Sequence, residues 1–240
     1  MNVAQATPIR AGDPGLRRWW LGLAAVSFVL TGCGDSVSGT PVAESAVSVR
    51  QVDGALADLL PSPARFPARY PAVVLPAQAA SAAAGDLDGV GAGATVRPAE
   101  CTPTEIEPGG EPAAVAVGSD EVSRATLTVE LSRSAELISR LREQLSRCGQ
   151  IHVSRAGAGS TVTTVLDQVV PPGADDAIAL RRTVVPDVGG AGLTQTMQTS
   201  IGQIGDVRIT VTSMTFGVGQ PDTAAVDEMF ATTVASVRGS

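Results

Sequence analysis

The sequence predicts an α+β fold, in which an antiparallel β-sheet of about six strands carries helices packed on one face. Three features predict it: apolar or alternating segments occur in runs, short turns rich in Gly, Pro and Asp separate them, and stretches with helical spacing precede and follow the runs. Strands joined by hairpin turns, with helices kept apart from them, are typical of this class. We therefore expect one domain over 51–240, built around a single core.

The first part of this domain is expected to hold short helices and an extended segment. Residues 52–60 are predicted to form a short helix that Pro61 and Pro63 stop. The proline-rich stretch 66–75 is expected to run extended, at a sheet edge or across the surface. The alanine-rich residues 77–84 are predicted to form a second helix.

The stretch 86–93, with the sequence DLDGVGAG, has features of two kinds of functional loop. It could open a calcium-binding loop or a glycine-rich phosphate loop. The calcium pattern lacks its third ligand and the distant Glu, and the glycine pattern follows no clear strand. We therefore expect an ordinary connecting loop.

Six strands are predicted, beginning with a hairpin and continuing after a helix. They are 112–118, 125–131, 161–170, 177–185, 193–204 and 206–216. In the last of these, apolar residues alternate with Arg208, Thr210 and Thr212. This alternation predicts a sheet with one face in water.

Two longer helices are expected to cover the sheet. The first starts at Ser132 or Ser134 and runs to Cys148, with Gly149 after its end. Its apolar side consists of Leu137, Ile138, Leu141, Leu145 and Cys148. The second starts near Pro221 and runs to Val237. Its inward side consists of Val226, Met229, Phe230, Thr233 and Val234.

Residues 1–32 have the pattern of a signal peptide. Arg10, Arg17 and Arg18 give a positive start, and the apolar stretch 19–30 follows. Twelve residues are too few for a membrane-spanning helix, which needs about 20. The Arg17-Arg18 pair leaves open whether export uses the general secretory or the twin-arginine route.

Cys33 ends the sequence LTGC, which resembles the lipobox of bacterial lipoproteins. That resemblance implies a diacylglycerol on the Cys33 sulfur and cleavage just before this residue. Residues 33–50 would then be a lipidated cysteine and a flexible tether, because 34–48 are small and polar. We expect the domain on the extracytoplasmic face of the cell membrane, held there by lipid.

If Cys33 carries lipid, the two remaining cysteines form an even pair. We expect a disulfide between Cys101 and Cys148, because disulfides persist in oxidising compartments. The alternative, a metal site, is weaker. Two separate cysteines and His152, the single histidine, do not supply four zinc ligands.

Composition excludes several classes of partner and cofactor. The net charge is −7 and all 17 basic residues are Arg. No basic face for nucleic acid is expected. A phosphate-loop lysine and a Schiff-base lysine are both absent, so we predict no cofactor.

Catalytic patterns are weak. His152 is the single candidate for a histidine base, and no serine lies in a Gly-x-Ser-x-Gly elbow. Carboxylate pairs such as Asp175-Asp176 or Glu105 and Glu107 are more simply loop residues. We predict no catalytic residue, with an envelope hydrolase as the alternative.

Several of these features together resemble mycobacterial-type lipoproteins with a PknH-like extracytoplasmic sensor domain. They are the segment 67–75, the Pro98-Ala99-Glu100-Cys101 loop, the helix ending in Cys148-Gly149 and the strands beyond it. The resemblance implies a domain outside the membrane that binds a ligand in a groove. This chain departs from the kinase version, because it has one candidate disulfide where two are expected, and a lipid in place of a kinase domain.

We therefore expect a non-catalytic, lipid-anchored binding or sensor-like protein of the cell envelope. Its partner would be a small or apolar envelope ligand or an envelope protein. A lipid carrier is a further alternative, and it predicts a large apolar cavity between the sheet and the helices.

Overall fold

The structure, a computed structural model, describes residues 49–91, 93–103 and 111–239. These residues belong to one unit that begins at Val47. The predicted signal peptide, Cys33 and nearly all of the tether lie outside the described residues, as do Glu105 and Glu107. Within the described ranges, no helix is long and apolar enough to cross a membrane.

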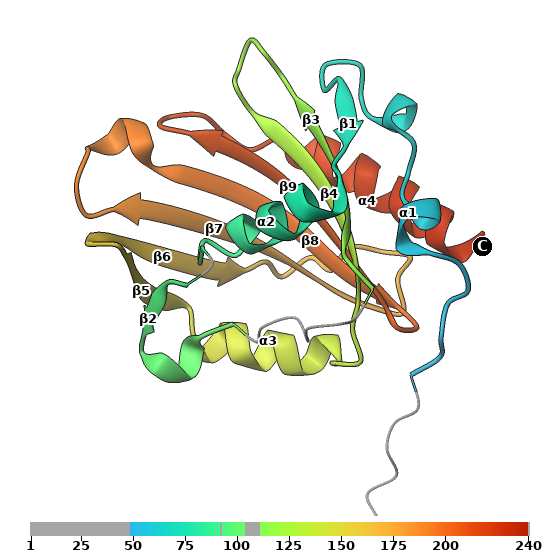
Figure 1. Cartoon of the computed structure of the whole chain (residues 1–240), viewed down its shortest axis with the longest axis horizontal. Coiled ribbons are helices and arrows are strands. Elements are labelled where there is room, and N and C mark those ends of the chain that lie inside the picture. The colour runs from blue at the N-terminus through green and yellow to red at the C-terminus, as the bar shows by residue number, and fades with distance from the viewer. Residues whose placement is uncertain (1–48, 92, 104–110, 240) are drawn as a thin grey trace, which may run out of the picture. The chain divides into compact units, whose positions relative to one another are not determined.

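A nine-stranded sheet forms the centre of the unit, and every neighbouring pair of strands is antiparallel (Figure 1). The strand order is β1-β3-β4-β9-β8-β7-β6-β5-β2. The strands are β1 (Ala72–Val74), β2 (Thr95–Arg97), β3 (Ala114–Ser119), β4 (Thr126–Arg133), β5 (Gln150–Arg155), β6 (Ala158–Leu166), β7 (Asp176–Pro186), β8 (Gln195–Ile204) and β9 (Val207–Phe216).

The prediction of about six strands is wrong, although all six predicted segments are strands. The three additional strands, β1, β2 and β5, lie at or near the two edges of the sheet. Two of them have only three residues, which is too short for a periodic pattern. Edge strands of this length can be recognised only from their hydrogen-bonded partner strand, as Val96 of β2 lies opposite Val153 of β5.

The helices are α1 (Leu56–Leu59), α2 (Ala77–Leu87), α3 (Ile138–Arg147) and α4 (Thr223–Arg238), with 3-10 turns η1 (Pro63–Arg65), η2 (Ala99–Cys101) and η3 (Ala191–Leu193). Strand β4 continues to Arg133, so α3 begins later than predicted, after Leu137. It ends at Cys148, as expected. Helix α2 extends to Leu87, so the stretch 86–93 begins in a helix and continues as a loop.

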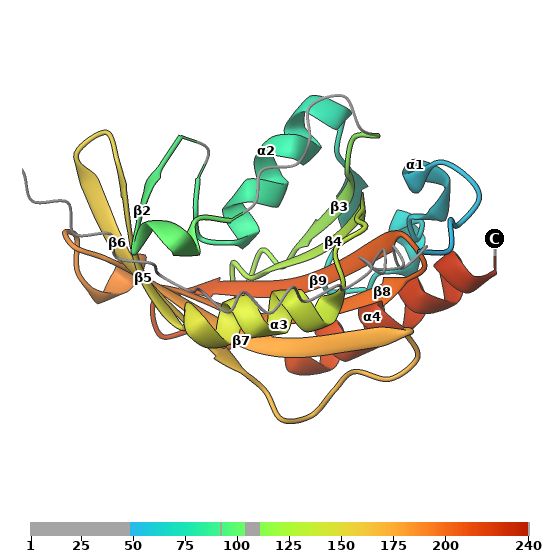
Figure 2. The same ribbon diagram turned by 90° about the horizontal axis from the view of Figure 1, so that it is seen from below.

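The prediction that helices cover one face is also wrong, because they cover both. Figure 2 shows α2 and α4 on opposite sides of the sheet. On β7, Ala177 packs in the α4 core while its neighbour Ile178 packs with Ile138 of α3. Successive strand residues face opposite sides, so α3 lies on the face away from α4.

The polar face of β9 is partly buried, because Arg208 and Thr210 are half-buried and Thr212 is buried. Thr212 has 1% of its surface exposed, and its hydroxyl lies 3.0 Å from that of Thr199 on β8. Residues 197–204 of β8 are all buried. The face that alternation assigned to water therefore lies under α2 and α3, and the hydroxyl groups of Thr199 and Thr212 hydrogen-bond to each other there.

The main core lies between the sheet and α4. Phe230 and Met229 of α4 pack against Leu127, Ile209 and other buried strand residues. A Cβ atom on Gly202 would lie 2.6 Å from the Phe230 ring, so only glycine allows this approach. This core fixes the sheet against α4, and the pocket described below lies on the opposite face.

The turn between β3 and β4 is organised by one carboxylate. Asp120 accepts hydrogen bonds from the Ser123 hydroxyl at 2.7 Å, from Arg69 Nη2 at 2.8 Å and from the Val122 N–H at 2.9 Å. These donors, with Ser123 the largest cause and Arg69 next, hold the pKa of Asp120 well below its ordinary value of 3.8.

We expect Asp120→Asn to lower the melting temperature by a few degrees at pH 7. The lowered pKa means that the carboxylate contributes stability above its ordinary pKa and loses it as the pH falls. The difference in melting temperature between wild type and variant should therefore become smaller towards pH 2. Thermal unfolding followed by circular dichroism measures it, with Glu121→Gln on the same turn as the control. Equal melting temperatures for the Asp120 variant and wild type would refute this role.

Candidate functional site

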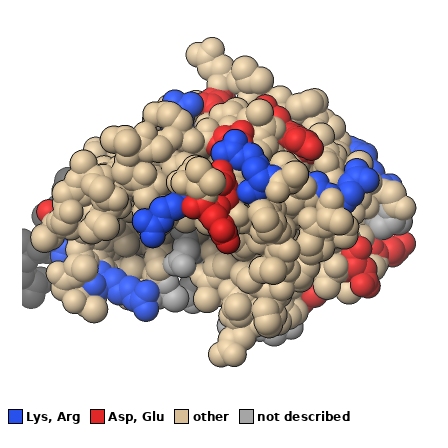
Figure 3. Space-filling view, turned by 90° about the horizontal axis from the view of Figure 1, so that it is seen from above, with Lys and Arg blue, Asp and Glu red and all other residues tan. Residues whose placement is uncertain are grey.

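The charged surface does not form a field of one sign on the face shown in Figure 3. Acidic and basic side chains lie interspersed there, and uncharged residues cover most of it. Such a surface does not offer the basic stripe that a nucleic-acid backbone requires. A site is better sought in the hollows of the sheet face under α3.

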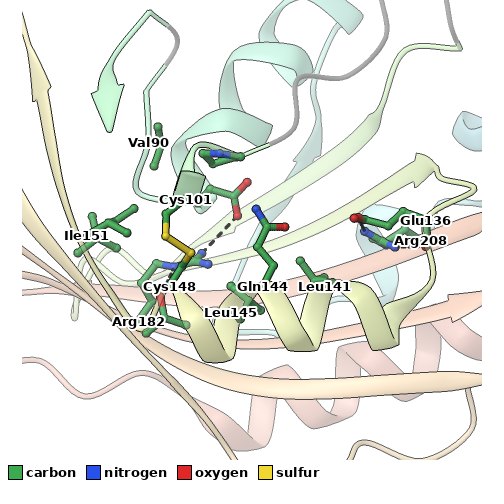
Figure 4. A pocket seen from close by; sticks show the side chains of 14 residues that line it. Val90, Cys101, Glu136, Leu141, Gln144, Leu145, Cys148, Ile151, Arg182 and Arg208 are labelled. Carbon is green, nitrogen blue, oxygen red and sulfur yellow. Dashed lines mark hydrogen bonds and ion pairs between the residues drawn. A yellow bond between two sulfur atoms is a disulfide. The ribbon is translucent and has the colours of Figure 1, made fainter. Parts of the chain in front are cut away.

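A pocket of about 160 Å³ lies on this face. It is bounded by α3, by η2 and the loop after α2, and by strands β5, β6, β7 and β9 (Figure 4). In the close-up, Arg208 and Glu136 lie together at one end, and Arg182 lies beside the disulfide towards the other. The pocket therefore combines two guanidinium groups with an apolar wall.

Strand alternation explains how these side chains meet. Arg182 of β7 lies opposite Thr164 of β6, and Arg208 of β9 lies opposite Gln203 of β8. All four therefore point to the face that α3 covers. Leu141 and Leu145, four residues apart on α3, project to the same side of the helix and line the pocket.

Arg182 is buried, with 7% of its side chain exposed. Its Nε donates to Thr164 Oγ1 at 3.2 Å, and its Nη1 donates to the Leu87 carbonyl and, at 3.4 Å, to Asp88 Oδ1. The Asp88 side chain is 55% exposed. The buried guanidinium is thus compensated mainly by neutral oxygens and by one distant, solvated carboxylate.

Arg208 is tied to the residue before α3. Its Nη1 lies 3.3 Å from Glu136 Oε2, and its Nη2 donates to the Glu136 carbonyl and to Gln203 Oε1. Its Nε is buried and has no hydrogen-bond partner, alone among the buried side-chain nitrogens and oxygens of the described residues. An unmet donor of this kind costs free energy unless a water or a ligand accepts from it.

The disulfide forms part of the pocket wall. Cys101 in η2 and Cys148 at the end of α3 are bonded, with their Cα atoms 5.6 Å apart. This is the pairing that the sequence predicts. With Ile151 and Val162 it forms an apolar surface, and it fixes η2 against the helix.

A buried carboxyl group lies on the same face of β4. Glu130 has 9% of its surface exposed, and its carboxyl makes no hydrogen bond or ion pair with another described residue. Burial first, and then the nearby Asp88, raise the pKa of Glu130 to about 7, against the opposing effect of Arg208. Near neutral pH this group is therefore divided between its neutral and charged forms.

His152 lies apart from this pocket. Its side chain is 44% exposed, and its Nε2 is 3.0 Å from Asp187 Oδ2 in a shallow hollow beside Gly159. No hydroxyl group in the described part of the chain hydrogen-bonds to His152. The described ranges also contain no group of three His, Cys, Asp or Glu side chains that could hold a metal.

The predicted carboxylate pair also has structural partners. Asp175 accepts from Arg238 and from the Gly205 N–H, and Asp176 pairs with Arg142. The two carboxylates therefore fasten loops and helices to the sheet. They show no arrangement around a cleft.

Sequence reasoning missed Arg182, Arg208 and Gln144, which line this pocket, and Glu130, which lies on the same face of the sheet. A signal was present for two of them, because Arg182 and Glu130 interrupt strands whose other residues are mostly apolar. A charge inside such a strand marks a special environment. Gln144 carries no such signal, because polar residues are ordinary on a helix.

Comparisons with known proteins give two similar solved structures. An uncharacterized protein from Mycobacterium smegmatis, an Rv0999 ortholog, aligns over 81% of this chain and 100% of its own, with 15% identity and a TM-score of 0.47. The extracellular domain of PknH from Mycobacterium tuberculosis aligns over 61% of this chain and 78% of its own, with 13% identity and a TM-score of 0.44.

The second structure is a domain of the kind that the sequence resembles, at low identity. No family model matches the chain. No curated protein matches it either.

Proposed function

We propose that this protein is a non-catalytic, lipid-anchored binding protein of the extracytoplasmic side of the cell membrane, and that its pocket under α3 holds a small molecule. The observation that carries the proposal is the pocket itself, where the buried Arg182 and the partly buried Arg208 line one cavity with an apolar wall. Few convergent polar groups in an otherwise apolar hollow are typical of ligand sites.

The energetic argument rests on the two guanidinium groups. A buried charge is costly unless it is fully paired, and a folding core does not need one. Arg182 is incompletely paired, and Arg208 Nε is not paired at all among the described residues. A ligand that accepts from these donors would recover part of this cost on binding.

The size of the pocket argues against the lipid-carrier alternative. A cavity of about 150 Å³ accommodates benzene, and this pocket of about 160 Å³ is similar. It does not offer room for the acyl chains of a membrane lipid. The hydrolase alternative would need a nucleophile or a positioned water at His152, whose one hydrogen-bond partner in the described ranges is Asp187.

Native mass spectrometry of the full-length protein, extracted gently from its own membrane, tests the binding function. We expect a small molecule to remain bound. It should be lost from Leu145→Trp, which fills the pocket, and kept in the surface control Leu193→Trp. Repeated recovery of the wild-type protein without a bound molecule would contradict the proposal.

Membrane attachment is tested separately by Cys33→Ala. If Cys33 carries the lipid, the variant should move from the membrane fraction to the soluble fraction, and its signal peptide should no longer be removed by the lipoprotein pathway. Fractionation and intact-mass measurement report both changes. Retention of the variant in the membrane at the wild-type level would refute the anchor.

A further inference from the structure

Arg182 carries the charge in the pocket that is least compensated. Arg208 and Glu136 pair with each other, so together they are neutral. Arg182 makes a comparable 3.4 Å contact with Asp88, but the Asp88 side chain is 55% exposed against 38% for Glu136, so water screens this pair more strongly. The part of the pocket next to Arg182 therefore favours a negative charge.

Arg182 also has a free donor directed at this space. Its Nε and Nη1 are used by Thr164, Leu87 and Asp88, whereas its Nη2 makes no hydrogen bond with any described residue. Gln144 projects from α3 into the pocket, and its amide likewise has no partner in the described ranges (Figure 4). Two donors from different elements thus line the same pocket.

The pocket is small, and one of its walls is apolar. Leu145, Ile151, Val162 and the disulfide form a wall that has no polar group to offer. A volume near that of a benzene-sized cavity leaves space for one ring or a short chain.

We infer that the ligand of this pocket is a small monocarboxylate with an apolar body. Its carboxylate accepts from Arg182 and Gln144, and its body packs against Leu145, Ile151 and the disulfide. This inference rests on the proposed function, since it names the chemical class that the same pocket takes. Guanidinium groups bind carboxylates through short, charge-assisted hydrogen bonds, which accounts for the buried Arg182.

Three probes of similar size test the inference on the full-length protein. Benzoate, benzamide and benzylamine share one ring and carry a negative, neutral or positive headgroup. Binding is followed by the NMR methyl signals of Leu141 and Leu145. We expect benzoate to bind at least about tenfold more tightly than benzamide, as a charge-assisted hydrogen bond gives, and benzylamine to bind most weakly.

Variants locate the effect. Arg182→Gln should reduce benzoate affinity to that of benzamide, and Gln144→Leu should reduce it by a smaller factor. Arg181→Gln is the matched control, because this neighbouring arginine is exposed and points to the other face of β7. The comparison of probes on the wild type requires no variant, so the test stands even if Arg182→Gln does not fold.

The outcomes separate this inference from the proposed function. Equal affinities for benzoate and benzamide, or tightest binding of benzylamine, would overturn the carboxylate assignment. So would the absence of any change at Leu141 and Leu145 with all three probes. A small molecule retained by the protein from its own membrane would still support the binding function in each of these cases.

Discussion

Replacing Cys101 and Cys148 together with alanine is expected to lower the free energy of unfolding by about 4 kcal/mol. The bond closes a loop between residues that are 47 positions apart, and on the chain-entropy account a loop of this length is worth about that much. Both thiols are removed at once, so no reactive cysteine remains in the domain. Urea unfolding followed by circular dichroism measures the change.

The same replacement should also affect the pocket. Without the bond, η2 is no longer fastened to the end of α3, and one wall of the pocket loses its anchor. Cys33→Ala is the matched control, and it should leave the unfolding free energy unchanged. A double variant as stable as wild type would contradict the structural role of the disulfide.

Glu130→Gln is expected to stabilise the protein at pH 8 by up to about 3 kcal/mol. Its pKa is raised from an ordinary value of 4.5 to about 7 in the folded state. The folded protein therefore binds the proton more tightly than the unfolded chain does, and wild-type stability falls as the pH rises from about 4.5 through 7. Glutamine mimics the neutral carboxyl group, so the variant avoids this loss.

Unfolding free energies at pH 5 and pH 8 measure this effect. The two proteins should be similar at pH 5 and differ at pH 8. Glu228→Gln, on the exposed side of α4, is the control and should show no such difference. A wild-type protein that is equally stable at both pH values would show that the buried carboxyl does not titrate as described.

Long periodic elements could be predicted from the sequence. Strand β9 and helix α4 have clear apolar spacing, and their observed bounds lie within three residues of the predicted ones. The pairing of Cys101 with Cys148 was accessible as well, because it needed only an even pair of thiols. The strand and the helix depend on a local pattern, and the disulfide depends on an even number of available cysteines. These features can therefore be predicted without knowledge of the fold.

Three other features could not be predicted in the same way. Short edge strands such as β2 carry too few residues for a pattern. The second helical layer was missed because Thr212 and Arg208 read as a wet face, although a face of hydroxyl and guanidinium groups can be buried when its polar atoms find partners. Alternation of apolar and polar residues along a strand therefore identifies a polar face of the sheet, but it does not show that this face is exposed to solvent.

The pocket is the feature that the sequence predicts least, because it depends on contacts between segments that are distant along the chain. Arg182 meets the Leu87 carbonyl 95 residues away, and Arg208 meets Glu136 72 residues away. Such contacts follow from sheet register and from where α2 and α3 lie, and neither is encoded in a short motif. The pocket comes from assembly of the fold and not from a recognisable run of residues.

A crystal structure of the full-length protein purified from its own membrane, at a resolution that shows ordered water, tests the central claim most directly. The account predicts density for an organic molecule between α3 and the sheet, with an oxygen within hydrogen-bond distance of Arg182 Nη2. A pocket closed by Gln144 and Leu145, or one holding water alone, would contradict it.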